Sequence, residues 1–166
     1  MSPHECLVII PDKFGYHANA NLLNGHVVTA RHVANGRARV IIPSENFDNT
    51  VYFLPVDDQD LSISAESVSG NGWHTVTVPI IGMMATFKGL HEHRSFWFTA
   101  KIIGIEDKRI IFSPPILGNT SLKLGMSGTA GFSENGFLGV ISKERNGGPV
   151  VESVFNIWQQ SKIFRT

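Results

Sequence analysis

The residues best suited to chemistry lie around Ser127, which stands in the segment Gly125-Met126-Ser127-Gly128. Glycines beside a serine permit positive φ angles and let a substrate carbonyl approach main-chain N–H groups closely. A serine nucleophile needs such surroundings, because N–H groups must stabilise the negatively charged oxygen that develops during acyl transfer. The same short pattern also occurs in ordinary loops, so the hypothesis of a nucleophile depends on a matching base elsewhere in the chain.

A candidate base, His32, lies far upstream at the end of the segment Thr29-Ala30-Arg31-His32. The run His26–Thr29 is apolar and β-branched, which predicts a strand that ends just before this histidine. Histidines ordinarily have a pKa of about 6.5, so one at a rigid strand end can take up and return a proton near neutral pH. A lone histidine in this position is more often a surface residue, and it is the Thr-Ala-x-His context that favours the catalytic interpretation.

A histidine base also needs a carboxylate that fixes its tautomer and stabilises the imidazolium. The sequence offers three candidates, Asp57, Asp58 and Asp60. Asp60 directly precedes the alternating apolar segment Leu61–Ala65, which predicts a strand, and is therefore preferred. The alternative is that all three belong to a solvated acidic turn, and the sequence leaves the choice among them open.

Composition limits the functions that this chain can have. The 166 residues include 42% apolar side chains, with 14 basic and 14 acidic residues and zero net charge. An apolar content this high is enough to form a core, which excludes an intrinsically disordered chain. A neutral chain is not attracted to nucleic acid by its overall charge, so nucleic acid is not expected as a partner. Cys6 is the sole cysteine, so we expect no intramolecular disulfide and a reducing, cytoplasmic location. Neither a leader peptide nor a membrane-spanning segment is expected.

Short β-branched runs separated by Gly, Pro, Asn and Asp predict an all-β protein. The expected strands are Cys6–Ile10, Ala18–Leu23, His26–Thr29, Ala38–Pro43, Val51–Val56, Leu61–Ala65, Thr75–Ile81, Ala85–Lys88, Phe96–Ile105, Arg109–Ser113, Gly128–Phe132, Phe137–Ser142 and Val150–Val154. Asn24-Gly25 predicts a tight hairpin turn. A helical turn is expected at Ala30–Ala34, and a short helix at about Phe155–Phe164.

Three separated segments resemble the chymotrypsin-like serine endopeptidases. Asn24–Val33 resembles their Thr-Ala-x-His block, Asp60–Ile63 their Asp-Leu-x-Ile block, and Gly125–Gly128 with Phe137–Ser142 their Gly-x-Ser-Gly and Gly-Val-x-Ser blocks. The order His, Asp, Ser also matches. Asp60 lies 28 positions after His32, and Ser127 lies 67 positions after Asp60. These short spacings are similar to those of compact viral main proteases of the sobemovirus, astrovirus and arterivirus type.

The resemblance implies two packed six-stranded antiparallel β-barrels and a short C-terminal helix. The expected division is an N-terminal barrel at 1–68, a linker at 69–74, a C-terminal barrel at 75–154 and a helical tail at 155–166. The roles implied are a Ser127 nucleophile, a His32 base, an Asp60 orienting group and oxyanion N–H groups on Gly125 and Ser127. Substrate-binding residues are expected at Thr120, Ser121, Ser142 and Lys143. Met126 stands where zymogen-activated members have aspartate, so no N-terminal activation switch is expected.

The implied activity is hydrolysis of peptide bonds, with a polypeptide substrate that could be the chain's own polyprotein in a host cytoplasm. No cofactor or metal is expected. His91-Glu92-His93 is better interpreted as a charged hairpin tip than as a metal site. The competing hypothesis is a catalytically inactive protease-fold module that binds other proteins. Cleavage preference, oligomeric state and viral or cellular origin are left open by the sequence.

Overall fold

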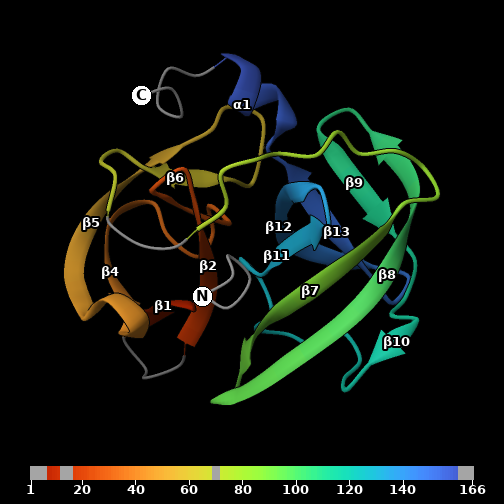
Figure 1. The fold of residues 1–166 in the computed structure, drawn as a ribbon, viewed down its shortest axis with the longest axis horizontal. Coiled ribbons are helices and arrows are strands. Elements are labelled where there is room, and N and C mark those ends of the chain that lie inside the picture. Colours follow the sequence, from red (N-terminus) through yellow and green to blue (C-terminus); the bar gives the residue numbers. More distant parts are fainter. Residues whose placement is uncertain (1–6, 12–16, 69–71, 161–166) are drawn as a thin grey trace.

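Six strands from the first part of the chain close into an antiparallel barrel, on the left in Figure 1. The computed structural model describes residues 7–11, 17–68 and 72–160. The barrel order is β1-β2-β3-β6-β5-β4, and the pairing of Ile9 with Ile41 closes the ring. Its elements are β1 (Val8–Pro11), β2 (His17–Leu23), β3 (His26–Thr29), β4 (Gly36–Ile42), the 3₁₀ helix η2 (Pro43–Glu45), β5 (Phe47–Pro55) and β6 (Ser62–Ser64).

Six later strands form a second closed barrel, on the right in Figure 1. They follow the order β8-β7-β11-β12-β13-β9, and a further pairing between β8 and β9 closes the ring. The short strand β10 adds to β8 outside this ring. The elements are β7 (Met84–His91), β8 (Arg94–Glu106), β9 (Arg109–Phe112), β10 (Leu117–Gly118), β11 (Ala130–Ser133), β12 (Gly136–Arg145), β13 (Gly148–Ser153) and helix α1 (Phe155–Gln160). The two expected six-stranded antiparallel barrels and the short C-terminal helix are therefore confirmed.

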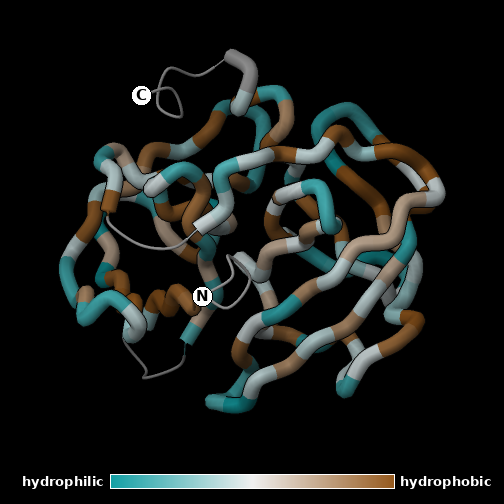
Figure 2. The backbone as a smooth tube through the Cα atoms, viewed as in Figure 1, coloured by the Kyte–Doolittle hydropathy of each residue, from teal (hydrophilic) through white to brown (hydrophobic). Residues whose placement is uncertain are grey.

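Two tight hairpins follow directly from their turn residues. Asn24 and Gly25 have φ angles of 50° and 82°, as the predicted Asn-Gly turn between β2 and β3 requires. Glu92 and His93 have φ angles of 51° and 67° and join β7 to β8. This second turn is the charged hairpin tip expected from the sequence, and Figure 2 shows its hydrophilic residues in teal at the lower end of the long hairpin.

Each barrel has its own apolar core, and a third cluster joins them. Leu22, Val27 and Phe53 lie inside the first barrel. The second barrel encloses mostly aromatic side chains, among them Phe87, Phe98 and Phe112. The joining cluster takes residues from both barrels: Leu23, Val28, Leu61, Ile63 and Trp73 from the first part of the chain, and Ala130, Phe137, Val140 and Val154 from the second. Burial of this shared surface holds the two barrels together and so positions any site between them.

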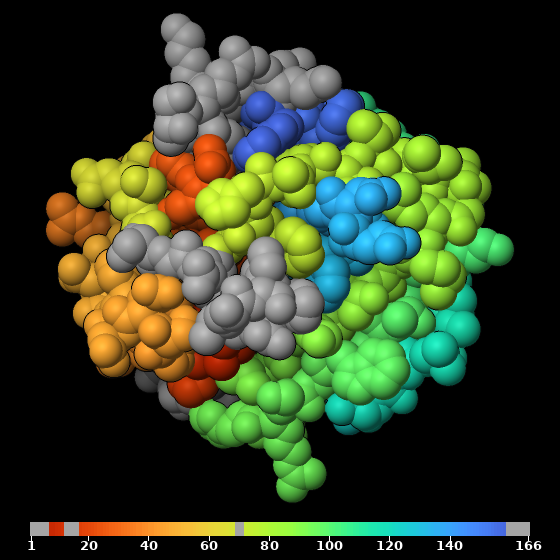
Figure 3. Space-filling model, in the orientation of Figure 1, coloured from red at the N-terminus to blue at the C-terminus, as the bar shows by residue number. Residues whose placement is uncertain are grey.

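The connection between the barrels departs from the sequence prediction. The expected strand Thr75–Ile81 is wrong, since this segment makes only an isolated bridge between Val76 and Phe137. Pro79 lacks the N–H that a ladder needs, which disfavours a regular strand here. In Figure 3 the yellow-green atoms of this connection lie on the surface between the two halves.

Some expectations fall beyond the part of the chain that the structure describes. These are the first residue of the strand Cys6–Ile10, residues 69–71 of the linker, and the end of the C-terminal helix beyond residue 160. The expected domain limits stay a prediction. Within the described ranges, no helix has the length and hydropathy needed to cross a membrane.

Candidate active site

His32 and Asp60 are brought together by the pairing of two neighbouring strands. His32 sits in the turn after β3, where the N–H groups of Val33 and Ala34 donate to Ala30 O at 3.0 Å and 3.2 Å. Asp60 lies two residues before β6, which pairs with β3 through Thr29 and Ser62. Adjacent strands lie less than 5 Å apart, so residues just beyond their paired ends come within side-chain reach.

Asp60 holds His32 through both of its carboxylate oxygens. The His32 backbone N–H donates to Oδ1 at 2.9 Å, and the ring Nδ1 lies 2.6 Å from Oδ2. A carboxylate only accepts hydrogen bonds, so Nδ1 carries the proton and Nε2 of the neutral ring is left as an acceptor. The side chains are 50% and 27% exposed, which leaves the histidine accessible and the carboxylate more enclosed. This geometry orients a histidine that can act as a base.

The other two aspartates do not share this arrangement. Asp57 and Asp58 are exposed, and Asp58 occupies a left-handed turn position with φ of 62°. Neither makes a hydrogen bond or ion pair with His32 in the described structure. Of the three carboxylates that the sequence left open, Asp60 is the one in contact with the histidine.

Gln59, which sequence reasoning missed, ties the aspartate loop to the second barrel. Its side chain is buried, and Nε2 donates to Ser153 O at 3.0 Å and to Lys108 O at 3.3 Å. The Val56 N–H closes the same loop by donating to Leu61 O at 2.9 Å. The available signal was an uncharged amide between the acidic residues of this turn. Buried amide side chains are hydrogen-bonded, so such a residue can link the turn to another part of the fold.

The Ser127 loop is anchored on both sides of the serine. Met126 is buried in the core of the second barrel, and the Thr129 hydroxyl donates to Met126 O at 2.6 Å. The Gly128 N–H donates to Ile141 O at 2.8 Å. Before the serine, His91 Nε2 lies 2.7 Å from Leu124 O, so the β7–β8 hairpin supports the loop as well. These contacts hold the residues on both sides of Ser127.

Gly128 places this loop against the strand that leads to His32. A Cβ at Gly128 would overlap Asn19 O and the Thr29 hydroxyl, and the φ angle of +87° further favours glycine. Thr29 is the last residue of β3, three positions before His32. The structure therefore brings Ser127 to the same region as His32 and Asp60. Among the described residues, no hydrogen bond joins the Ser127 hydroxyl to the His32 ring.

Asn19 fixes the relation between the barrels beside this loop. Its side chain is 3% exposed, and it exchanges two hydrogen bonds with the backbone of Leu90 in β7. Nδ2 donates to Leu90 O at 2.9 Å, while Oδ1 accepts from Leu90 N–H at 2.8 Å. A side chain that pairs in this way extends the backbone hydrogen bonding from β2 to β7, and so supports the contact with Gly128.

Two main-chain N–H groups next to Ser127 are available for a ligand. Within the described residues, no acceptor bonds to the N–H of Gly125 or of Ser127. Gly125 has a φ angle of +94°, which only glycine adopts without strain. These are the two donors that the sequence resemblance implied for an oxyanion.

A pocket of about 250 Å³ opens beside the serine. It is lined by residues of the Ser127 loop and of the β12–β13 hairpin: Leu122, Lys123, Leu124, Gly125, Met126, Ser127, Ile141, Lys143, Glu144 and Gly147. The expected substrate-binding residue Lys143 is among them.

The three other expected substrate-binding residues do not line this pocket. The Thr120 hydroxyl donates to Ser121 O at 2.9 Å, and Ser121 is exposed. Ser142 is buried and donates to Glu152 Oε2 at 2.9 Å. Ser142 sits at a break in the β12–β13 register, between Ile141 and Lys143. Such a bulge re-aims a side chain, which accounts for its inward position.

No family model matches the sequence, and no curated protein matches it either. Solved structures do match its three-dimensional form. A serine protease of a human pathogenic astrovirus has a TM-score of 0.66 at 14% identity, covering 92% of this chain and 91% of that one. Catalytically active tobacco etch virus protease, complexed with product, has a TM-score of 0.65 at 13% identity, covering 97% and 78%.

This chain has the chymotrypsin-like fold. A scabies mite inactivated protease paralogue is similar to the same degree, with a TM-score of 0.68 at 10% identity, covering 96% of this chain and 91% of that one. Identities this low establish the chymotrypsin-like fold alone.

Proposed function

We propose that this protein is a serine endopeptidase with Ser127 as nucleophile, His32 as general base and Asp60 as the orienting carboxylate. The observation that carries the proposal is the double hydrogen bond from His32 to Asp60, which leaves Nε2 as the free acceptor of the ring. The anchored Ser127 loop and its two available N–H groups support the same assignment. So does the fold, which the chain shares with an astrovirus serine protease.

In the proposed reaction, Ser127 Oγ attacks the carbonyl carbon of the scissile peptide bond and gives its proton to His32 Nε2. The carbonyl oxygen becomes an oxyanion and accepts hydrogen bonds from the N–H groups of Gly125 and Ser127. Collapse of this intermediate breaks the C–N bond, and His32 returns the proton to the leaving amine. Water then hydrolyses the acyl-enzyme by the same steps, with His32 again as base. Asp60 keeps the proton on Nδ1 throughout.

The proposed substrate is a polypeptide, and the finer hypothesis is a viral polyprotein that contains the protease itself. Two observations support it: the short spacings between the three site residues, and the similar folds of the astrovirus and tobacco etch virus proteases. A viral polyprotein that includes this sequence tests it. We expect cleavage of that polyprotein by the native protein, and none when Ser127 is alanine.

A fluorophosphonate probe tests the proposed nucleophile, because only an activated serine reacts with it. We expect covalent labelling of the native chain and none of Ser127→Ala or His32→Ala. Ser44→Ala is the matched control, since Ser44 is exposed in η2 on the first barrel and should leave labelling unchanged. Labelling that persists in a folded Ser127→Ala protein would refute the assignment.

The second candidate is an inactive binding module. It is favoured by one observation, the equally similar fold of the scabies mite inactivated protease paralogue. This hypothesis predicts that the folded native chain resists the probe at every pH between about 6 and 9. The intact pair of His32 and Asp60 supports the enzyme instead, because a binding module has no need of an oriented base.

A further inference from the structure

The charges around the pocket beside Ser127 are unequal. This inference rests on the proposed function and concerns the substrate of the same site. Two lysines and one glutamate are the charged residues that line the pocket: Lys123 from the serine loop, and Lys143 and Glu144 from β12. The three belong to two different segments that meet at the pocket.

Glu144 is occupied within its own hairpin. Its carboxylate Oε1 accepts a hydrogen bond from the Gly147 N–H at the β12–β13 turn. The next residue, Arg145, is also engaged, with Nη1 bonded to Glu106 Oε2 at 2.7 Å. These contacts direct the only acidic side chain of the pocket toward the turn backbone, where it closes the hairpin.

The two lysines have no such partner. Among the described residues, neither Lys123 nor Lys143 forms an ion pair, and both are exposed. Unpaired ammonium groups at the rim of a cleft create a positive potential, which is stronger there than on an open surface because the low-dielectric walls focus the field. The pocket therefore favours an anion.

The walls limit the kind of anion. Leu122 and Ile141 supply apolar surface to the pocket, and its volume of about 250 Å³ suits one amino-acid side chain. A side chain with a short methylene stem and a terminal carboxylate uses both features, since the stem contacts the apolar wall and the carboxylate reaches the ammonium groups. A basic side chain would meet like charge, which costs affinity.

We infer that this pocket selects a glutamate or aspartate whose carbonyl carbon is the one attacked by Ser127, and that Lys143 is the main specificity-determining residue. Lys143 is placed for this because it lies on β12 directly after the bulge at Ser142 and lines the same pocket as the serine loop. Lys123 adds positive charge from the serine loop. Above about pH 6 the substrate carboxylate is almost fully ionised and the preference is fully expressed.

Three peptides that differ only in this residue (glutamate, glutamine or lysine) measure the preference. A hydrogen bond between charged groups corresponds to about a 10- to 100-fold difference in kcat/KM. The glutamate peptide should therefore have a kcat/KM higher than that of the glutamine peptide by this factor. Lys143→Gln should bring the two peptides within about threefold of each other, and Lys143→Glu should make the lysine peptide preferred over the glutamate peptide. Equal rates for the three peptides in the native enzyme would overturn the inference.

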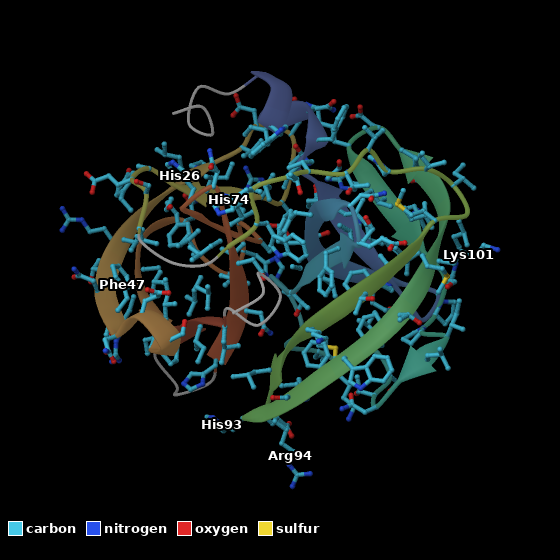
Figure 4. All side chains as sticks on the ribbon, in the orientation of Figure 1. His26, Phe47, His74, His93, Arg94 and Lys101 are labelled. Carbon is cyan, nitrogen blue, oxygen red and sulfur yellow. The ribbon has the colours of Figure 1, made fainter. Side chains whose placement is uncertain are left out.

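Lys101→Gln is the matched control. Lys101 is an exposed lysine on β8, at the right-hand edge of the second barrel in Figure 4, and it does not line the pocket. It should keep the full preference for glutamate. Loss of the preference in this variant as well would point to overall charge instead of the pocket, and would overturn the role of Lys143.

The fluorophosphonate probe separates this inference from the proposed function, because the probe has no side chain for the pocket to select. A protein that labels at Ser127 but shows no preference for acidic peptides contradicts the specificity alone. A folded protein that neither labels nor cleaves any of the three peptides contradicts the protease assignment, and the substrate inference with it. Labelling together with a Lys143-dependent glutamate preference supports both.

Discussion

Replacement of Asp60 by asparagine tests the geometry of the proposed site most directly. Asparagine keeps the shape of the side chain. It also keeps an oxygen in the place of Asp60 Oδ1, which accepts from the His32 backbone N–H at 2.9 Å. The amide NH₂ takes the place of Oδ2, which lies 2.6 Å from His32 Nδ1. Because an NH₂ group only donates, Nδ1 must become the acceptor and the ring proton moves to Nε2. The histidine then cannot accept the serine proton.

The expected loss in kcat is about 10⁴-fold, the size of effect found when an orienting aspartate of this kind becomes asparagine. At about 1.36 kcal/mol for each factor of ten, this corresponds to about 5.4 kcal/mol of lost transition-state stabilisation. The free energy of unfolding should fall by only about 1 kcal/mol, since both hydrogen bonds are kept, one of them with donor and acceptor exchanged, and only the carboxylate charge is lost. Activity and stability therefore separate in this variant.

The neighbouring aspartates supply matched controls in the same loop. Asp57→Asn and Asp58→Asn change the charge by the same amount, and asparagine tolerates the left-handed φ of 62° at Asp58. Both should stay within about twofold of native kcat/KM on the same peptide. Fluorophosphonate labelling rates and urea unfolding would be measured for all three variants. If Asp57→Asn or Asp58→Asn lost as much activity as Asp60→Asn, the assignment of the orienting carboxylate would be wrong.

Two further predictions concern the contact between the barrels. Asn19→Ala removes two hydrogen bonds to Leu90 and should lower the free energy of unfolding, measured in urea, by about 1–3 kcal/mol. Asn35 is exposed, so Asn35→Ala should change this free energy by less than about 0.5 kcal/mol. Equal effects of the two substitutions would contradict a stabilising role for the contact between Asn19 and Leu90. Gly128→Ala introduces a Cβ that overlaps neighbouring atoms and should slow fluorophosphonate labelling at least tenfold. Gly36 is the control, because it has a similar positive φ of 75° but no atom lies within 4 Å of an added Cβ. Gly36→Ala should therefore lose only about 1–2 kcal/mol of stability and react with the probe at the native rate. Slow labelling in both variants would exclude the overlap at Gly128 as the cause.

Local signals in the sequence predicted most of the fold. The Asn24-Gly25 turn and the strands on either side of it were predicted because type I′ turns have strong residue preferences. The segment Thr75–Ile81 was mispredicted, since β-branched residues favour an extended backbone whether or not a partner strand is available. Strand β10 was missed because a strand of two residues carries no periodic signal.

The sequence by itself determined which residues could do chemistry: a serine between glycines, a histidine after a strand, and an aspartate before another. Residue type and short-range spacing suffice for this, because turn conformations and strand ends depend mainly on neighbouring residues. Only the tertiary structure decided that Asp60, and neither Asp57 nor Asp58, bonds to His32. It also decided that Lys143 lines the pocket while Ser142 turns inward to Glu152. Those outcomes depend on strand pairing, a bulge and inter-barrel contacts such as that of Asn19 with Leu90, which join residues far apart in the chain.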